Sequence, residues 1–144
     1  MKRITIALLT LLICVGALTS CSDFFISLNE DSSIRELDAL QQEYESKGYR
    51  VTRASQEEVT SFNESIVAQE GLILKGALTG KMEYEYTNPE TGEFTWGITI
   101  GTSHDDDAKA IADMYRDMGE ALNNVKVNVS NRGLIVYVTY TYEN

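Results

Sequence analysis

The chain of 144 residues has few of the side chains from which catalytic and metal centres are built: two cysteines, one histidine, one tryptophan and one proline. Cys14 lies inside an uncharged run, so once that run is removed Cys21 has no partner for an internal disulfide. A Ser/His or Cys/His centre would have to be built around His104, and nothing in the sequence connects a particular serine to it. We therefore expect no enzyme activity and no cofactor.

A hydrophobic run long enough for a permanent transmembrane helix is also missing. The uncharged stretch from Ile4 to Ala17 has roughly 14 residues, whereas about 20 are needed to span the hydrocarbon core of a bilayer. Lys2 and Arg3 precede it, which is the layout of a signal peptide. We expect residues 1–20 to be removed from the mature protein.

The sequence Leu18-Thr19-Ser20-Cys21 directly follows this run and resembles the lipobox of bacterial lipoproteins at all four positions. The resemblance implies a diacylglycerol on the Cys21 sulfur, cleavage before Cys21 and, in many cases, acylation of the new amine. Two or three acyl chains, at about 0.8 kcal/mol per buried CH₂, hold a small protein on a membrane. The alternative is an ordinary secretory signal, with Cys21 as a free thiol or in an intermolecular disulfide.

Lipidation at Cys21 would place the protein at the cell membrane or the outer membrane of a bacterium, exported and lipid-anchored. In a cell with two membranes, Ser22 stands where an Asp would resemble an inner-membrane retention signal, which favours the outer membrane. Asp23, one place later, points the other way.

Negative charge dominates what remains after cleavage. Ten basic and 22 acidic residues give a formal charge of −12, because Lys2 and Arg3 leave with the signal peptide. No Lys/Arg patch of the kind that attracts phosphate backbones is visible, so nucleic acid is excluded as an expected partner. The remaining length suffices for one core. We predict a lipidated Cys21 with a tether at 21–31 and a single domain at 32–144.

Three amphipathic helices are predicted from apolar residues at helical spacing and from serines at their starts. The first follows Ser33 and ends at Gly48, the second follows Ser55 and ends near Gly71, and the third follows Ser103. The third has the longest apolar stripe, made of Ala108, Ile111, Ala112, Tyr115, Met118 and Leu122.

Two long strands are predicted by alternation of apolar or glycine residues with polar ones, over 72–86 and over 94–100. The apolar residues of both have even numbers. They share a face of the sheet only if the numbers of paired residues sum to an even value, as with Tyr84 opposite Trp96.

Shorter strands are predicted at 49–53, 125–129 and 134–142. From residue 49 the order is then βαββαβ, followed by one more strand. We predict an α+β domain in which two helices pack on one face of an antiparallel, ferredoxin-like sheet, with an N-terminal helix before this unit and an extra C-terminal strand after it. In the alternative arrangement, the helix that begins at Ile34 covers the opposite face.

One cluster of metal-binding side chains stands out, where His104 is followed by Asp105, Asp106 and Asp107. An imidazole and three carboxylates could hold a divalent cation. The spacing matches neither an EF-hand loop nor a paired-histidine zinc site, and acidic residues at a helix start also stabilise the helix dipole. We therefore assign no metal to these residues and retain them as candidates.

Tyrosines crowd the last strand, where Tyr137, Tyr140 and Tyr142 are candidates for contacts with another protein. If that strand is an open edge, it could pair with an envelope protein or with a second copy. The function we expect is a non-enzymatic interaction domain, tethered to the membrane through Cys21. The alternative is a metal- or small-ligand-binding module, or a weak hydrolase, that uses His104 and its aspartates.

Overall fold

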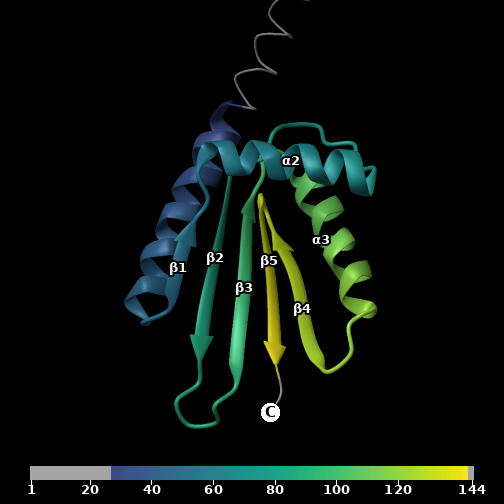
Figure 1. Ribbon diagram of the computed structural model, residues 1–144. Helices are drawn as coiled ribbons and strands as arrows, with labels where there is room; N and C mark the ends of the chain where they lie inside the picture. Colours follow the sequence, from purple (N-terminus) through teal and green to yellow (C-terminus); the bar gives the residue numbers. More distant parts are fainter. Residues whose placement is uncertain (1–26, 143–144) are drawn as a thin grey trace, which may run out of the picture.

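The computed structural model describes residues 27–142, which form a single α+β domain with a five-stranded antiparallel sheet and three helices. Figure 1 shows the strands side by side, with α2 crossing one end of the sheet and α3 running along the side of β4. The predicted signal peptide and Cys21 lie outside the described residues, so the predictions made for them stay predictions.

The elements follow one another in the predicted order. They are an N-terminal helix at residues 27–46, β1 (Arg50–Arg53), α2 (Gln56–Glu70), β2 (Gly80–Thr87), β3 (Phe94–Gly101), α3 (Asp105–Glu120), β4 (Val125–Arg132) and β5 (Ile135–Tyr142).

The predicted ferredoxin-like topology is wrong in its strand order, which is β1-β2-β3-β5-β4. A ferredoxin-like sheet would place the first strand of the βαββαβ unit in the interior, but β1 lies at an edge and β5 lies between β3 and β4. The lengths and burial of these strands explain the difference. β1 has four residues, none of them buried, whereas β5 has eight, of which four are buried and one is exposed. A buried strand needs hydrogen-bonding neighbours on both sides, because its backbone groups have no access to water.

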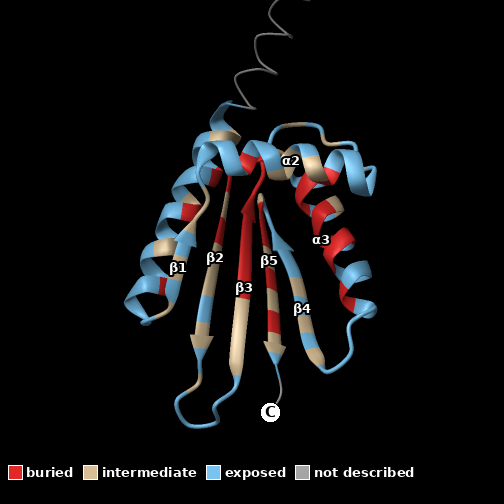
Figure 2. Cartoon of the chain, viewed as in Figure 1, coloured by how far each residue is buried: buried red, intermediate tan, exposed pale blue. Residues whose placement is uncertain are grey.

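Helices cover both faces of the sheet. On one face, Ile66 of α2 and Ile111 of α3 belong to the same core cluster as Ile98 of β3. On the opposite face, Leu37 of the N-terminal helix packs in a second cluster with Met82 of β2. The prediction of two helices on one face is confirmed, and the alternative placement of the N-terminal helix is the one observed. Figure 2 shows that β3 is buried toward α2 and less buried toward its other end.

The even-sum register predicted for the two long strands is wrong. Tyr84 lies opposite Gly97 and Tyr86 opposite Thr95, so the apolar side of β2 and the apolar side of β3 face opposite ways. Because the N-terminal helix covers one face and α2 with α3 the other, each strand buries its apolar side under a different helix. The charged residues of β2 therefore share a face with the apolar residues of β3.

The first half of the predicted 72–86 strand is also wrong, since residues 71–79 are irregular. Leu72 and Leu74 do pack against the core, which explains the alternation. However, the backbone N–H groups of Lys75 and Gly76 donate to the carboxylate of Asp107 at 2.8 and 2.9 Å, in place of a strand ladder.

The helix ends agree with the sequence in α2 and differ in the other two helices. Ser55 makes the expected capping box with Glu58, and Gly71 ends α2 in the left-handed region. The N-terminal helix is already formed at residue 27, so residues 27–31 belong to the domain and not to the tether. The residue that caps α3 is His104, not Ser103.

Candidate interaction surface

Four aromatic side chains form a compact group on the face of the sheet that carries α2 and α3. Phe94 and Trp96 of β3 lie opposite Tyr142 and Tyr140 of β5. The ring centroids are 5.8 Å apart for Phe94 and Tyr142, and 5.1 Å apart for Trp96 and Tyr140. These separations are typical of attractive aromatic pairs. We call these residues the aromatic block.

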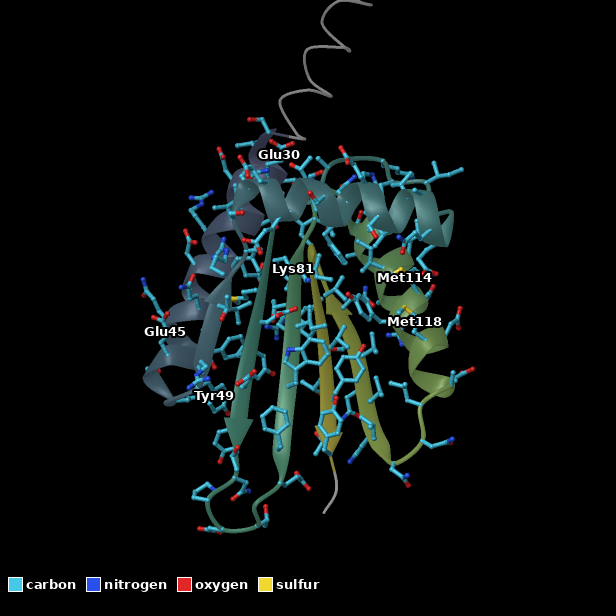
Figure 3. The ribbon with its side chains drawn as sticks, viewed as in Figure 1. Glu30, Glu45, Tyr49, Lys81, Met114 and Met118 are labelled. Atoms are coloured by element: carbon cyan, nitrogen blue, oxygen red, sulfur yellow. The ribbon has the colours of Figure 1, made fainter. Side chains whose placement is uncertain are left out.

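The aromatic block lies where the sheet is least covered by helices. Among the described elements, α3 packs on β4 and β5, and α2 makes its sheet contacts with β2. Figure 3 shows side chains in front of the lower halves of β3 and β5 with no helix over them. Tyr142 is 41% exposed, whereas Tyr140 is 7% exposed. The block therefore presents one accessible ring on a base of packed rings, which suits a contact surface.

Two carboxylates of β2 flank the aromatic block. Glu85 lies opposite Trp96, and Glu83 lies opposite Ile98 one step further along β3. Each forms an ion pair: the Arg50 guanidinium lies 3.9 Å from the Glu85 carboxylate, and the Lys81 ammonium lies 3.4 Å from the Glu83 carboxylate. Both Glu side chains are at least 41% exposed, and ion pairs between exposed groups contribute little. The carboxylates can therefore exchange these cations for those of a partner.

A shallow groove of about 460 Å³ continues this surface toward the β2–β3 hairpin. It is lined by Gly48, Arg50, Glu85, Tyr86, Thr87, Pro89 and Phe94. Because Phe94 and Glu85 belong to both the groove and the flanked aromatic block, a single extended segment of a partner could contact both.

Burial affects the ionisation of the tyrosines under and beside this surface. Burial raises the pKa of Tyr140, and Tyr142 adds to the effect. Burial also raises the pKa of Tyr115 on α3, with smaller contributions from Tyr140 and Glu83. The phenols of Tyr140 and Tyr115 therefore stay neutral at neutral pH and can donate or accept hydrogen bonds.

The three tyrosines predicted as contact residues do not act together. Tyr140 and Tyr142 belong to the aromatic block, but Tyr137 points to the opposite face and packs with the cluster under the N-terminal helix. The idea that the last strand is an open edge is wrong, because β5 is paired on both sides. The edge strands are β1 and β4.

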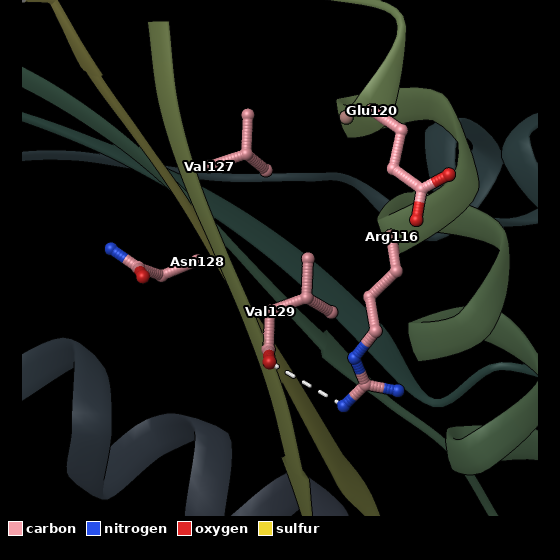
Figure 4. Close-up of a pocket in the computed structure, with 6 residues that line it drawn as sticks. Arg116, Glu120, Val127, Asn128 and Val129 are labelled. Carbon is pink, nitrogen blue, oxygen red and sulfur yellow. Dashed lines mark hydrogen bonds between the residues drawn. The ribbon is translucent and has the colours of Figure 1, made fainter.

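The β4 edge is partly blocked. Figure 4 shows Arg116 of α3 reaching across a groove to β4, where its guanidinium donates to the carbonyl of Val129 at 3.4 Å. The groove has a volume of about 460 Å³ and is lined by Arg116, Gly119, Glu120, Val127, Asn128 and Val129. A charged side chain that reaches over an edge strand and occupies one of its carbonyls works against pairing with another strand. The aromatic block is thus the better candidate surface.

His104, Asp105 and Asp106 do come together, with one ligand atom from each within 4.8 Å of the others. However, these atoms already have partners. The Nδ1 atom of His104 accepts the backbone N–H of Asp106 at 3.1 Å, which caps α3. The Asp106 carboxylate accepts a hydrogen bond from Lys75, and this contact lowers the pKa of Asp106.

Asp107 does not belong to the cluster of His104, Asp105 and Asp106, because its carboxylate binds the backbone of the 71–79 segment. It is 2% exposed, and its two oxygens accept the N–H groups of Lys75 and Gly76. Asp106 and Asp107 therefore hold the 71–79 segment against the start of α3, in addition to their place in its acidic first turn. Three of the four predicted metal candidates, His104, Asp106 and Asp107, thus have structural partners, while the ligand atoms of His104, Asp105 and Asp106 remain within 4.8 Å of one another.

Sequence reasoning missed that Phe94, Glu83 and Glu85 belong with the tyrosines. The period-two pattern places Phe94 and Trp96 on one side of β3, and Tyr140 and Tyr142 on one side of β5. That signal was available, but only the strand order shows that the two sides are neighbours. The position of the glutamates depends on the register, for which the sequence favoured the wrong parity.

No protein-family model, curated protein or solved structure matches the chain. Within residues 27–142, none of the helices has both the length and the apolar character needed to cross a bilayer.

Proposed function

We propose that this protein is a bacterial lipoprotein whose domain is a non-enzymatic interaction module at the cell envelope, held on the cell membrane or the outer membrane through lipid on Cys21. The pattern at residues 18–21 supports the anchor, as does the otherwise unexplained lone cysteine of the mature chain. The acidic domain has no basic patch to hold it on anionic lipid, so retention depends on the acyl chains.

The aromatic block with its two glutamates is the observation that carries the interaction role. Large rings that are packed on one side and accessible on the other provide contact area at low entropic cost. The mature formal charge of −12, together with Glu83 and Glu85 beside the rings, favours a partner segment with both basic and apolar side chains. The proposed partner is an envelope protein that presents such a segment.

The position of the aromatic block within the domain supports the same role. The described chain begins near the end of the sheet that α2 crosses. Phe94 of β3 and Tyr142 of β5 are paired with each other at the other end of the sheet (Figure 1). A tether at the first end leaves the rings on the far side from the anchor. They then face other envelope components and not the protein's own membrane.

The anchor is tested by the Cys21→Ser variant and by mass spectrometry of the mature N-terminus. We expect the native protein to begin at Cys21 with acyl mass on it, and the variant to leave the membrane fraction. A native protein without acyl mass, or a variant that stays in the membrane fraction, would refute the lipid tether.

The interaction surface is tested by photo-crosslinking in intact cells, with benzoylphenylalanine at Tyr142 or, as a matched control, at Thr141. These neighbours in β5 point to opposite faces of the sheet. We expect a crosslinked protein from position 142 that is absent from position 141. Exchange of Glu83 and Glu85 for lysine should abolish it, whereas exchange of the exposed Glu57 and Glu64 should not. Equal products from both positions, or a product insensitive to charge reversal at β2, would refute the proposal.

A further inference from the structure

Ile73, in the segment between α2 and β2, is the most exposed large apolar side chain among the described residues, at 93%. Its neighbours Leu72 and Leu74 point inward and pack against the core. Ile73 is therefore turned away from the domain. An isoleucine that contacts so little of its own protein adds little to folding and leaves its apolar surface available for contact.

The support under Ile73 is firmly held. Asp107 accepts the N–H groups of Lys75 and Gly76 at 2.8 and 2.9 Å, and the hydroxyl of Ser103 donates to the carbonyl of Ala77 at 3.2 Å. A Cβ at position 76 would lie 2.1 Å from the Ser103 hydroxyl oxygen, so a larger residue there would have to displace the hydroxyl that donates to Ala77. The segment thus displays Ile73 on a fixed base, which avoids the entropy loss of ordering a mobile loop on contact.

This segment lies at the end of the domain where the described chain begins. Ser33 and Thr79 share a hydrogen bond of 2.6 Å between their hydroxyls, and the side-chain amide of Asn29 donates to the carbonyl of Ser103 at 3.2 Å. Figure 1 shows the 71–79 segment and the start of the N-terminal helix at the same end of the molecule. Leu28, in the first described turn, is 44% exposed.

The distance from the anchor is short. Ser27 follows Cys21 by six positions, and six residues reach at most about 20 Å when fully extended. A lipid on Cys21 therefore keeps this end of the domain within about one small-domain diameter of the bilayer surface. An apolar side chain fixed on that end meets the membrane surface repeatedly, because the tether keeps its local concentration high.

We propose that Ile73, assisted by Leu28, inserts into the lipid surface that holds Cys21, so that the domain rests with its α2 end against the bilayer. The inference rests on the proposed lipid anchor. The contact is apolar and does not depend on basic residues. The insertion would fix how the domain is oriented relative to the bilayer, because β3 then carries Phe94 about 23 Å further from the membrane than Gly101.

The test uses the full lipidated chain in phosphatidylcholine vesicles that contain lipid brominated near the headgroup. Trp96→Phe removes the one native tryptophan, and Ile73→Trp introduces a reporter at the proposed contact. The matched control is Thr91→Trp, at the exposed hairpin on the far end of the sheet. If position 73 lies about 5–10 Å into the interface, its emission should shift to the blue and be quenched at least about twofold, with position 91 unaffected.

A second measurement avoids any change in the aromatic block. Ile73→Cys provides a single free thiol, since Cys14 leaves with the signal peptide and Cys21 is acylated. A spin label there should be more accessible to oxygen than to a water-soluble nickel complex, and a label at Thr91→Cys should show the reverse. If positions 73 and 91 behave alike in both measurements while Cys21 carries its acyl mass, insertion is refuted and the anchor stands. If Cys21 carries no acyl mass, the proposed anchor is refuted.

Discussion

Gly97 and Tyr84 offer a sharp test of the observed register, because the structure places one directly against the other. They are paired across β2 and β3, and a Cβ at Gly97 would lie 2.1 Å from both Cε1 and Cζ of Tyr84. The tyrosine ring cannot move away freely. Its centroid is 4.4 Å from that of Tyr44 and 5.4 Å from that of Tyr49. In the predicted even-sum register the two residues would not be opposite each other.

The expected energies follow from this geometry. Gly97→Ala overpacks the site and should lower the free energy of unfolding by about 2–3 kcal/mol. Tyr84→Ala should lower it by about 2–3 kcal/mol, somewhat less than the loss of a fully buried ring. In the double variant the added methyl has room, and alanine is favoured over glycine in a strand by about 0.5–1 kcal/mol. The coupling between the two positions should therefore be about 3 kcal/mol.

The assay is urea unfolding of the wild type, both single variants and the double variant, monitored by far-ultraviolet circular dichroism. The slope of the unfolding free energy against urea concentration should be the same in all four proteins, which checks that unfolding remains two-state. We expect the double variant to be at least as stable as Tyr84→Ala alone. If the two single effects add within about 0.5 kcal/mol, Tyr84 does not lie over Gly97 and the register described above is wrong.

Three other outcomes are expected. Asp107→Asn should lower the free energy of unfolding by about 2–3 kcal/mol, because an amide N–H₂ would then face a backbone N–H, whereas Asp106→Asn at the exposed neighbouring position should change the urea midpoint little. Equal effects of the two variants would contradict the structural role of Asp107. Burial raises the pKa of Tyr84 to about 12 and also raises that of Tyr44, so the folded state holds these protons more tightly than the unfolded state. Their stabilisation is complete below the unfolded pKa of about 10 and is lost as the pH rises toward 12, so the urea midpoint should fall over that window, less steeply in Tyr84→Phe. Parallel pH curves for Tyr84→Phe and the wild type would contradict this assignment.

Local features of the fold could be predicted because they depend on neighbouring residues. The capping box of Ser55 and Glu58, the left-handed Gly71 and the buried stripe of α3 from Ala108 to Tyr115 all lie within a few positions of the residues that cause them. Met118 and Leu122, which the same pattern placed in the stripe, are exposed, and Leu122 lies beyond the end of α3. The period-two pattern placed the strands for the same reason. It failed at 71–79, where Leu72 and Leu74 alternate like strand residues although side chains, not a neighbouring strand, hold the backbone.

Long-range features could not be predicted, since they depend on which faces the helices cover. The even-sum register assumed one buried face, and a one-residue shift in parity turns every side chain of a strand to the other side. Met82 is buried and Tyr84 half-buried under the N-terminal helix, while Ile98 and Ile100 are buried under α2 and α3. Nothing in the sequence of β2 or β3 alone distinguishes this arrangement from a single shared core.

The candidate surface depends on the same two corrections. With β5 at an edge of the sheet beyond β4, Tyr140 and Tyr142 would have no partners on β3, and the aromatic block would not exist. With the even-sum register, Glu83 and Glu85 would lie on the face away from Trp96. The inserted β5 brings the rings together, and the odd-sum register brings the carboxylates beside them. A variant that disturbs the register, such as Gly97→Ala, should therefore weaken crosslinking from position 142 even though Gly97 lies outside the aromatic block.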